Sequence, residues 1–137
     1  MGLGPRVWLA GATGAIGKRL VPLLVQHAST VFGTTRSAAR AAALRRQGVE
    51  PVVVDVFDAA ALTRAMIDAG PDVVIHQLTD LAFIHDPGRR EEALTRNARL
   101  RAEGTRNLVA AAREAEARRL IAQSIAWLLM RSGVTGT

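Results

Sequence analysis

Several residue types are missing or scarce in this chain of 137 residues, and each absence excludes a kind of chemistry. The chain has no cysteine, which excludes a disulfide scaffold, a thiolate metal site and a cysteine nucleophile. It has no tyrosine, which excludes a phenolic acid or base, and its single lysine is Lys18. No apolar run approaches the roughly 18 residues that cross a membrane. The sequence therefore predicts a domain without a membrane segment.

The charge balance is positive, with 18 basic and 12 acidic residues, a net charge of +6 and an isoelectric point near 11.5. Such a balance is typical of proteins that bind nucleic acid. The arginines are interleaved with carboxylates, however, as in residues 89–92 and 113–116. Three phenylalanines and two tryptophans are too few for a platform that stacks bases. We therefore interpret the charges as solvated helix faces and expect no nucleic-acid partner.

Length and composition favour one soluble domain. The hydrophobic fraction of 49% and the charged fraction of 22% are typical of globular proteins. The first six residues hold no basic cluster followed by an apolar run, so they do not form a signal peptide. We expect a cytoplasmic protein with one domain over residues 1–127, followed by a tail over residues 128–137 that carries no periodicity.

Short apolar runs alternate with segments of helical periodicity along the chain. Continuous apolar strands separated by helices are typical of a parallel sheet that is covered on both faces. Right-handed crossovers then give a doubly wound, Rossmann-like α/β fold with five strands in the order 3-2-1-4-5. The expected strands are residues 6–10, 30–34, 50–54, 72–77 and 120–123, and the expected helices are residues 16–27, 38–47, 59–69 and 89–117.

Three glycines follow the first expected strand at the spacing G-x-x-G-x-x-G. Gly11 allows a tight turn out of the strand, Gly14 lets a pyrophosphate approach the backbone, and Gly17 allows the next helix to pack close to the sheet. The free N–H groups and the positive dipole end of that helix then face the phosphates. This strand, turn and helix predict a dinucleotide site, with Gly11, Thr13, Gly14, Ala15, Ile16 and Gly17 as its residues.

The end of the second strand indicates which dinucleotide binds. An Asp or Glu there would hold the 2′-hydroxyl of NAD, but residues 33–37 read GTTRS. Thr35 takes the place of the acid, and a guanidinium such as that of Arg36 can hold a 2′-phosphate by two hydrogen bonds. We therefore expect NADP to be preferred over NAD, with Thr35 and Arg36 in the site and Arg40 in support. In the alternative interpretation, Arg36 is a solvated residue at the start of a helix.

The segment from Val7 to Gly17 resembles the start of the extended short-chain dehydrogenases, the NAD(P)-dependent epimerase/dehydratase family. The run that begins at Gly104 is similar to that family's Gly-Thr-x-Asn-Leu helix, and the likeness covers roughly residues 6–127. The resemblance implies an NAD(P)-binding Rossmann domain. It also implies that Asp55 and Val56 contact the adenine, that Leu78 and Thr79 line the cofactor, and that Ser124 stands where the family has its catalytic serine.

The chain departs from this family at the catalytic residues. The family uses a Tyr-x-x-x-Lys pair downstream of the serine, and this chain has no tyrosine and no lysine after Lys18. The likeness stops after Trp127. One hypothesis is a truncated or frame-shifted product, the cofactor half of a longer oxidoreductase or epimerase, which is inert alone and whose substrate the sequence does not identify. The alternative is an NADP-sensing regulatory module without catalysis.

Two polar residues, the histidine spacing and the open sheet edge give four further expectations. His76 lies within an apolar strand and is expected to be a packed core histidine. Asn97 stands one turn from the position, here Arg101, at which the family often has an active-site asparagine. No pair of histidines has the spacing of metal ligands, so we expect no metal site. A sheet that ends at its fifth strand leaves an edge open, which predicts self-association through that edge.

Overall fold

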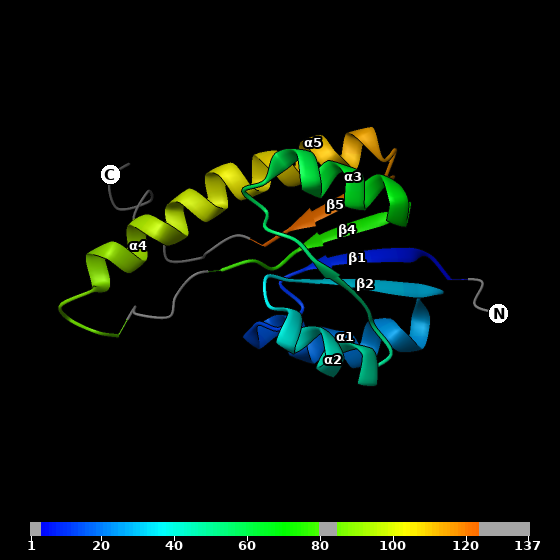
Figure 1. Ribbon diagram of the computed structural model, residues 1–137, viewed down its shortest axis with the longest axis horizontal. Coiled ribbons are helices and arrows are strands. Elements are labelled where there is room, and N and C mark those ends of the chain that lie inside the picture. The colour runs from blue at the N-terminus through cyan, green and yellow to red at the C-terminus, as the bar shows by residue number, and fades with distance from the viewer. Residues whose placement is uncertain (1–3, 80–84, 124–137) are drawn as a thin grey trace, which may run out of the picture.

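The computed structural model describes residues 4–79 and 85–123, and its centre is one parallel sheet (Figure 1). The strand order is β3-β2-β1-β4-β5, and every neighbouring pair is parallel. The predicted fold class and strand order are therefore confirmed. The strands are β1 (Arg6–Ala10), β2 (Thr30–Thr35), β3 (Glu50–Val53), β4 (Val73–His76) and β5 (Arg119–Ala122).

Helices cover both faces of this sheet (Figure 1). One pair lies on one face and the second pair lies on the other, as right-handed crossovers on either side of β1 require. None of the helices in the described residues is long and apolar enough to cross a membrane. The first pair is α1 (Ala15–His27) and α2 (Ala38–Arg46), and the second pair is α3 (Ala59–Ala69) and α5 (Thr105–Glu114).

The central strand β1 shows why both faces need cover. Val7 and Leu9 belong to the core layer that includes Val21 of α1, while Trp8 and Ala10 belong to the layer formed with α3 and α5. All four strand residues are at most 3% exposed. Burial of a large apolar side chain contributes about 1.5–3 kcal/mol, so the alternation along β1 anchors both layers.

The long helix expected over residues 89–117 is divided. It consists of α4 (Arg90–Arg99), a π-helical turn η1 (Leu100–Gly104) and α5. The buried residues Asn97, Leu100, Gly104 and Leu108 nevertheless continue at helical spacing through the turn. A π turn, closed by i→i+5 hydrogen bonds, holds one residue more than an α-helical turn, and the buried positions still follow one another at three- or four-residue spacing. The apolar spacing therefore predicted a helix but could not reveal the interruption.

Local sequence signals act at the start of α3 and at the ends of α2 and α3, whereas α5 ends without a glycine. Asp58 Oδ1 accepts a hydrogen bond from the Ala61 N–H at 3.1 Å and caps α3, which ends at Gly70 with φ +58°. Gly48, after α2, has φ +84°. After α5 the left-handed position is taken by Glu116, with φ +58°. This backbone conformation destabilises the fold when the residue carries a Cβ, whereas a glycine adopts it without that steric cost.

The ends of β2 to β5 differ from the predicted ends by one residue, which lengthens the loops after β3 and β4 at the carboxyl end of the sheet. β3 stops at Val53 and β4 at His76, so residues 54–57 and 77–79 lie in loops beyond the strands.

The edge of the sheet at β5 is exposed. Ile121 on β5 is 52% exposed, and among the described residues β5 pairs with β4 alone. The self-association expected at this edge stays a prediction.

Candidate functional site

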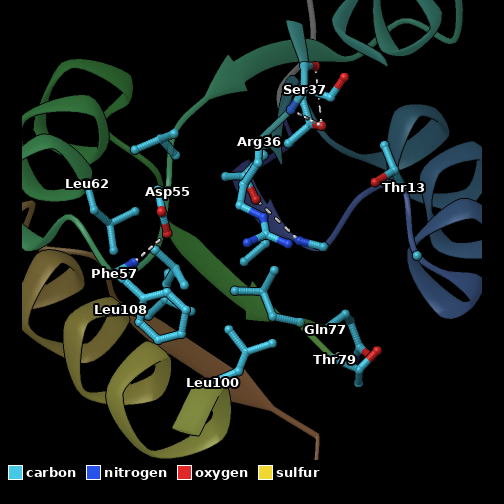
Figure 2. Close-up of a pocket in the computed structure, with 18 of the residues that line it drawn as sticks. Thr13, Arg36, Ser37, Asp55, Phe57, Leu62, Gln77, Thr79, Leu100 and Leu108 are labelled. Carbon is cyan, nitrogen blue, oxygen red and sulfur yellow. Dashed lines mark hydrogen bonds between the residues drawn. The ribbon is translucent and has the colours of Figure 1, made fainter. Parts of the chain in front are cut away.

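A cavity of about 680 Å³ lies beyond the carboxyl ends of the strands (Figure 2). Ligands of doubly wound sheets bind at this edge, where the strand order reverses, here between β1 and β4. The volume lies in the range of small-molecule sites. The lining consists of Ala10, Gly11, Thr13, Gly14, Thr34, Thr35, Arg36, Ser37, Arg40, Val54, Asp55, Val56, Phe57, Leu62, Gln77, Leu78, Thr79, Arg96, Arg99, Leu100 and Leu108.

Most of the residues that the sequence predicts to bind a cofactor are in this lining. Ala15 and Ile16 instead form the exposed first turn of α1, and Gly17 is buried beneath the glycine turn. Ser124 lies outside the described residues, so its role stays a prediction. The predicted residues that line the cavity are Gly11, Thr13, Gly14, Thr35, Arg36, Asp55, Val56, Leu78 and Thr79.

The glycine turn is built by close backbone contacts. Gly11 has φ +89°, and a Cβ there would lie 2.7 Å from the Gln77 carbonyl oxygen. A Cβ on Gly17 would overlap the Gly11 carbonyl oxygen, so α1 can pack against the turn because residue 17 is a glycine. A Cβ on Gly14 would meet the Gly11 oxygen at an ordinary 3.4 Å. Packing within the described chain therefore requires Gly11 and Gly17 but not Gly14.

Gly14 is the N-cap of α1, and no side chain caps this helix. The first N–H groups of an α-helix have no acceptor within the helix. At the start of α1 these groups and the helix dipole form a site for an anion, next to a residue that has no side chain to obstruct it.

Two buried threonines fix the end of β2. Thr34 Oγ1 accepts a hydrogen bond from the Gly11 N–H at 3.3 Å, which ties β2 to the glycine turn. Thr35 Oγ1 accepts from the Ser37 N–H at 3.1 Å and lies 3.4 Å from the Ser37 carbonyl oxygen. The Thr35 hydroxyl therefore shapes the turn that carries Arg36. The sequence around Thr34 indicates no role for this residue, since nothing local to it signals a contact with a residue 23 positions away.

The cavity is lined by four arginines and one carboxylate, Asp55. In the view of Figure 2, Arg36, the residue directly after β2, extends into the space between Asp55 and Thr13. Within residues 4–79 and 85–123, neither Arg36 nor Arg40 forms an ion pair with a carboxylate. This side of the cavity is therefore suited to an anionic ligand.

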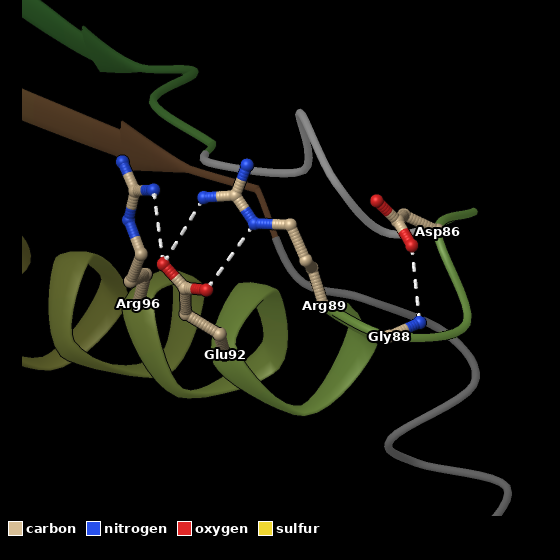
Figure 3. Close-up of polar contacts among 5 residues, drawn as sticks. All are labelled: Asp86, Gly88, Arg89, Glu92 and Arg96. Atoms are coloured by element: carbon tan, nitrogen blue, oxygen red, sulfur yellow. Dashed lines mark hydrogen bonds and ion pairs between the residues drawn. The ribbon is translucent and has the colours of Figure 1, made fainter.

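The arginines on the opposite side are engaged with acids of their own helix. Glu92 lies between Arg89 and Arg96, at 3.3 and 3.9 Å (Figure 3). The hydrogen bond from Arg89 is the main cause that lowers the pKa of Glu92. Arg99 pairs with Glu103 at 3.2 Å, and its guanidinium lies 4.3 Å from the ring centre of Phe57. Among the four arginines that line the cavity, the two without an acidic partner in the described residues are thus Arg36, directly after β2, and Arg40 of α2.

The loop after β3 is held from both sides. Asp55 Oδ1 accepts a hydrogen bond from the Phe57 N–H at 2.9 Å, which closes a tight turn. The Val56 carbonyl oxygen accepts from Asn107 Nδ2 at 2.8 Å. A Cβ on Gly104 would meet the Val56 side chain at an ordinary 3.5 Å, so η1 packs against the loop without requiring a glycine there. The Gly-Thr-x-Asn-Leu run therefore positions the lining of the cavity, a role that its sequence alone does not state.

His76 is a packed histidine, as predicted, with a 5% exposed side chain. Its ring nitrogens contact the Leu78 N–H and the Thr105 hydroxyl. Asn97 is buried and does not line the cavity. At the position where the related family often has asparagine, Arg101 donates to the Gln123 carbonyl oxygen at 2.8 Å. No group of three or more acidic or histidine side chains in the described residues could hold a metal ion.

Comparisons with known proteins agree with this geometry. The sequence model of a family described as NAD(P)H-binding matches residues 11–132. A 3-diazoavenalumate denitrifying reductase from a Streptomyces species is 46% identical over 128 residues, which are 93% of this chain and 40% of that protein. A decarboxylating sterol-4-alpha-carboxylate 3-dehydrogenase from Dictyostelium discoideum is 34% identical over 70 residues, 51% of this chain and 21% of that one.

Solved structures share the fold at low sequence identity. The Bordetella bronchiseptica enzyme WbmG, in complex with NAD, has a TM-score of 0.70 at 22% identity, over 88% of this chain and 37% of that one. A yeast methylglyoxal/isovaleraldehyde reductase complexed with NADPH has a TM-score of 0.69 at 22% identity, over 87% and 36%. A UDP-glucose 4-epimerase from Stenotrophomonas maltophila has a TM-score of 0.72 at 19% identity, over 89% and 37%.

The chain thus spans about 40% of the length of its Streptomyces relative and a similar share of these structures. The match over residues 11–132 contains the glycine turn, the end of β2 and both loops of the cavity. The predicted resemblance to the NAD(P)-dependent epimerase/dehydratase family is confirmed. This chain belongs to the NAD(P)H-binding family, whose model matches residues 11–132.

Proposed function

We propose that this chain is the cofactor-binding part of an NAD(P)H-dependent reductase and that it prefers NADPH to NADH. The end of β2 carries the preference: Thr35 stands where an acid would select NAD, and Arg36 and Arg40 line the cavity without an acidic partner in the described residues. A phosphate monoester carries a charge of about −1.5 to −2 at pH 7, and a guanidinium can hold it by two hydrogen bonds.

In this proposal, the dinucleotide lies along the carboxyl edge of the sheet. The N–H groups at the start of α1, where Gly14 leaves the backbone bare, hold the pyrophosphate. Asp55 and Val56 contact the adenine, and Leu78 and Thr79 line the rest of the cofactor. The cofactor supplies the hydride when bound, while these residues bind and orient it.

The Streptomyces relative supports the choice of a reductase, because its name describes a reductase that acts on a diazo compound. A diazo compound is therefore the first hydride acceptor to test with a longer protein that contains this domain. We propose that the 137 residues alone bind the cofactor without turnover, since they lack the Tyr-x-x-x-Lys pair. The absence of this pair also supports a second candidate, an NADP-sensing module without catalysis. Turnover by a longer protein that contains this domain would favour the reductase, and binding without turnover would favour the module.

Calorimetric titration of NADPH and NADH into variants of the chain tests the role of Arg36. Arg36→Ala is expected to weaken NADPH binding about 10- to 100-fold, because a hydrogen bond to a charged group contributes about 1.5–3 kcal/mol, and to change NADH binding little. Arg64→Ala removes an exposed arginine of α3 that does not line the cavity and is the matched control. An Arg36→Ala variant that weakens both cofactors equally would overturn the assignment.

A further inference from the structure

A buried histidine lies beneath one wall of the dinucleotide cavity. His76 is the last residue of β4, and the next residues of the chain, Gln77, Leu78 and Thr79, line the cavity. The conformation of this wall therefore depends on how the chain leaves the strand at His76.

Both ring nitrogens of His76 are hydrogen-bonded. The Leu78 backbone N–H donates to Nδ1 at 3.2 Å, and Nε2 lies 2.9 Å from Thr105 Oγ1. A backbone N–H can only donate, so Nδ1 is the unprotonated acceptor, and Nε2 carries the proton and donates to Thr105. The geometry therefore fixes the neutral Nε2–H tautomer.

The surroundings of the ring oppose its protonation. In the sheet, His76 pairs with Ala10 of β1 and Ala122 of β5, and α5 contributes the uncharged Thr105. The charged neighbour is Arg101 of η1. Burial and then the charge of Arg101 hold the pKa of His76 below its ordinary value of 6.5. In the part of the chain that the structure describes, no carboxylate acts against these two effects.

We propose that His76 is a positioning residue: its neutral ring holds the wall at residues 78 and 79 in the binding conformation, and protonation of the ring weakens dinucleotide binding. A proton on Nδ1 would point at the Leu78 N–H, so two donors would meet where one hydrogen bond now exists, and the wall would have to move. The coupling between protonation of His76 and binding rests on the proposed function, because the ligand in it is a dinucleotide. The assignment of the Nε2–H tautomer does not depend on the proposed function.

The coupling is tested by the affinity of the full chain for NAD⁺, measured by calorimetry from pH 8 to pH 5. NAD⁺ is the probe because it lacks the 2′-phosphate of NADP, and the second ionisation of a phosphate monoester, near pH 6, would add its own pH dependence. The affinity is expected to fall about 5-fold below pH 6.5, as for the loss of one hydrogen bond.

Two variants identify the group responsible. In His76→Asn, Oδ1 can accept the N–H two residues ahead, as in an Asx turn, so binding at pH 7.5 is retained and its pH dependence disappears. His27→Asn changes an exposed histidine at the end of α1 and should keep the unmodified pH profile. His76→Asn with the unmodified profile, or an unmodified chain whose affinity does not vary with pH, would overturn the coupling.

A ligand-free measurement separates this inference from the proposed function. Nitrogen-15 spectra of the imidazole should give the Nε2–H tautomer at pH 7.5, and the protection factor of the Leu78 amide against hydrogen exchange, corrected for the intrinsic rate at each pH, should fall as the ring is protonated. An Nδ1–H tautomer would overturn the positioning role. Failure of both NAD⁺ and NADPH to bind at any pH would overturn the proposed function and the coupling together, while the tautomer would still decide whether His76 holds Leu78.

Discussion

The two walls of the cavity are built in opposite ways. The glycine wall, residues 11–17, consists of backbone packed on backbone, and its close contacts leave no room for side chains at Gly11 and Gly17. The helix-held wall, residues 54–57 and 77–79, is kept in place by side chains of α5. Asn107 reaches the Val56 carbonyl group, and Thr105 reaches the ring of His76.

This difference determines whether a mutation in each wall should reduce the stability of the fold or the binding of the cofactor. A methyl group in a backbone contact cannot be accommodated without moving α1 or β4, so a change in the glycine wall should affect the whole fold. A lost hydrogen bond frees one loop and leaves the core packed. Changes in the helix-held wall should therefore reduce cofactor binding more than folding.

The largest effect is expected for Gly17→Ala. Its Cβ would overlap the Gly11 carbonyl oxygen, and overpacking of this kind costs about 1–3 kcal/mol or more of unfolding free energy. Alanine is the better helix former, so local propensity acts in the opposite direction. Urea unfolding of Gly17→Ala and of the control Gly14→Ala measures the difference. Equal loss of stability in the two variants would contradict the proposed packing of the glycine wall.

An intermediate effect is expected for Asn107→Ala. The change leaves the Val56 carbonyl group without its 2.8 Å partner, which costs about 1–3 kcal/mol where that group stays away from water. NADPH affinity should fall while the urea midpoint moves less than in Gly17→Ala. Arg106→Ala, at an exposed neighbouring position of α5, is the control for both measurements. Unchanged NADPH affinity in Asn107→Ala would show that the loop after β3 does not need this bond.

The smallest effect is the contribution of His76 to stability at low pH. Burial lowers the pKa of His76 in the folded chain below its ordinary value of 6.5, so the unfolded chain binds the proton more tightly. The contribution is therefore complete above pH 6.5 and is lost as the pH falls through the folded pKa. Urea unfolding at pH 7.5 and pH 5 should give a larger decrease for the unmodified chain than for His76→Asn. An equal decrease in both would exclude this contribution.

The sequence predicted the glycine wall better than the helix-held wall. The spacing of Gly11, Gly14 and Gly17 between a strand and a helix carries its own physical reason, and the strand order follows from chain connections that are right-handed. These signals are local, or depend on rules that hold for most folds. The structure has the predicted order, Gly11 has the positive φ of a tight turn, and Gly17 lets α1 pack closely, as predicted.

The helix-held wall depends on partners far apart in the chain. Asn107 and Val56 are 51 residues apart, and Thr105 and His76 are 29 apart. No local pattern encodes such a pair, so a resemblance identified the Gly-Thr-x-Asn-Leu run without explaining it. Thr35 is a similar case: it lines the cavity as predicted, but its hydroxyl group is bound to Ser37.

The proposed dinucleotide site selects NADPH through the residues at the end of β2. Calorimetric titration of the unmodified chain with NADPH and, separately, with NADH at pH 7.5 tests this selection. We expect saturable binding of both cofactors, with NADPH bound at least about tenfold more tightly, because of one guanidinium–phosphate interaction. Saturable binding of neither cofactor, or tighter binding of NADH, would contradict it.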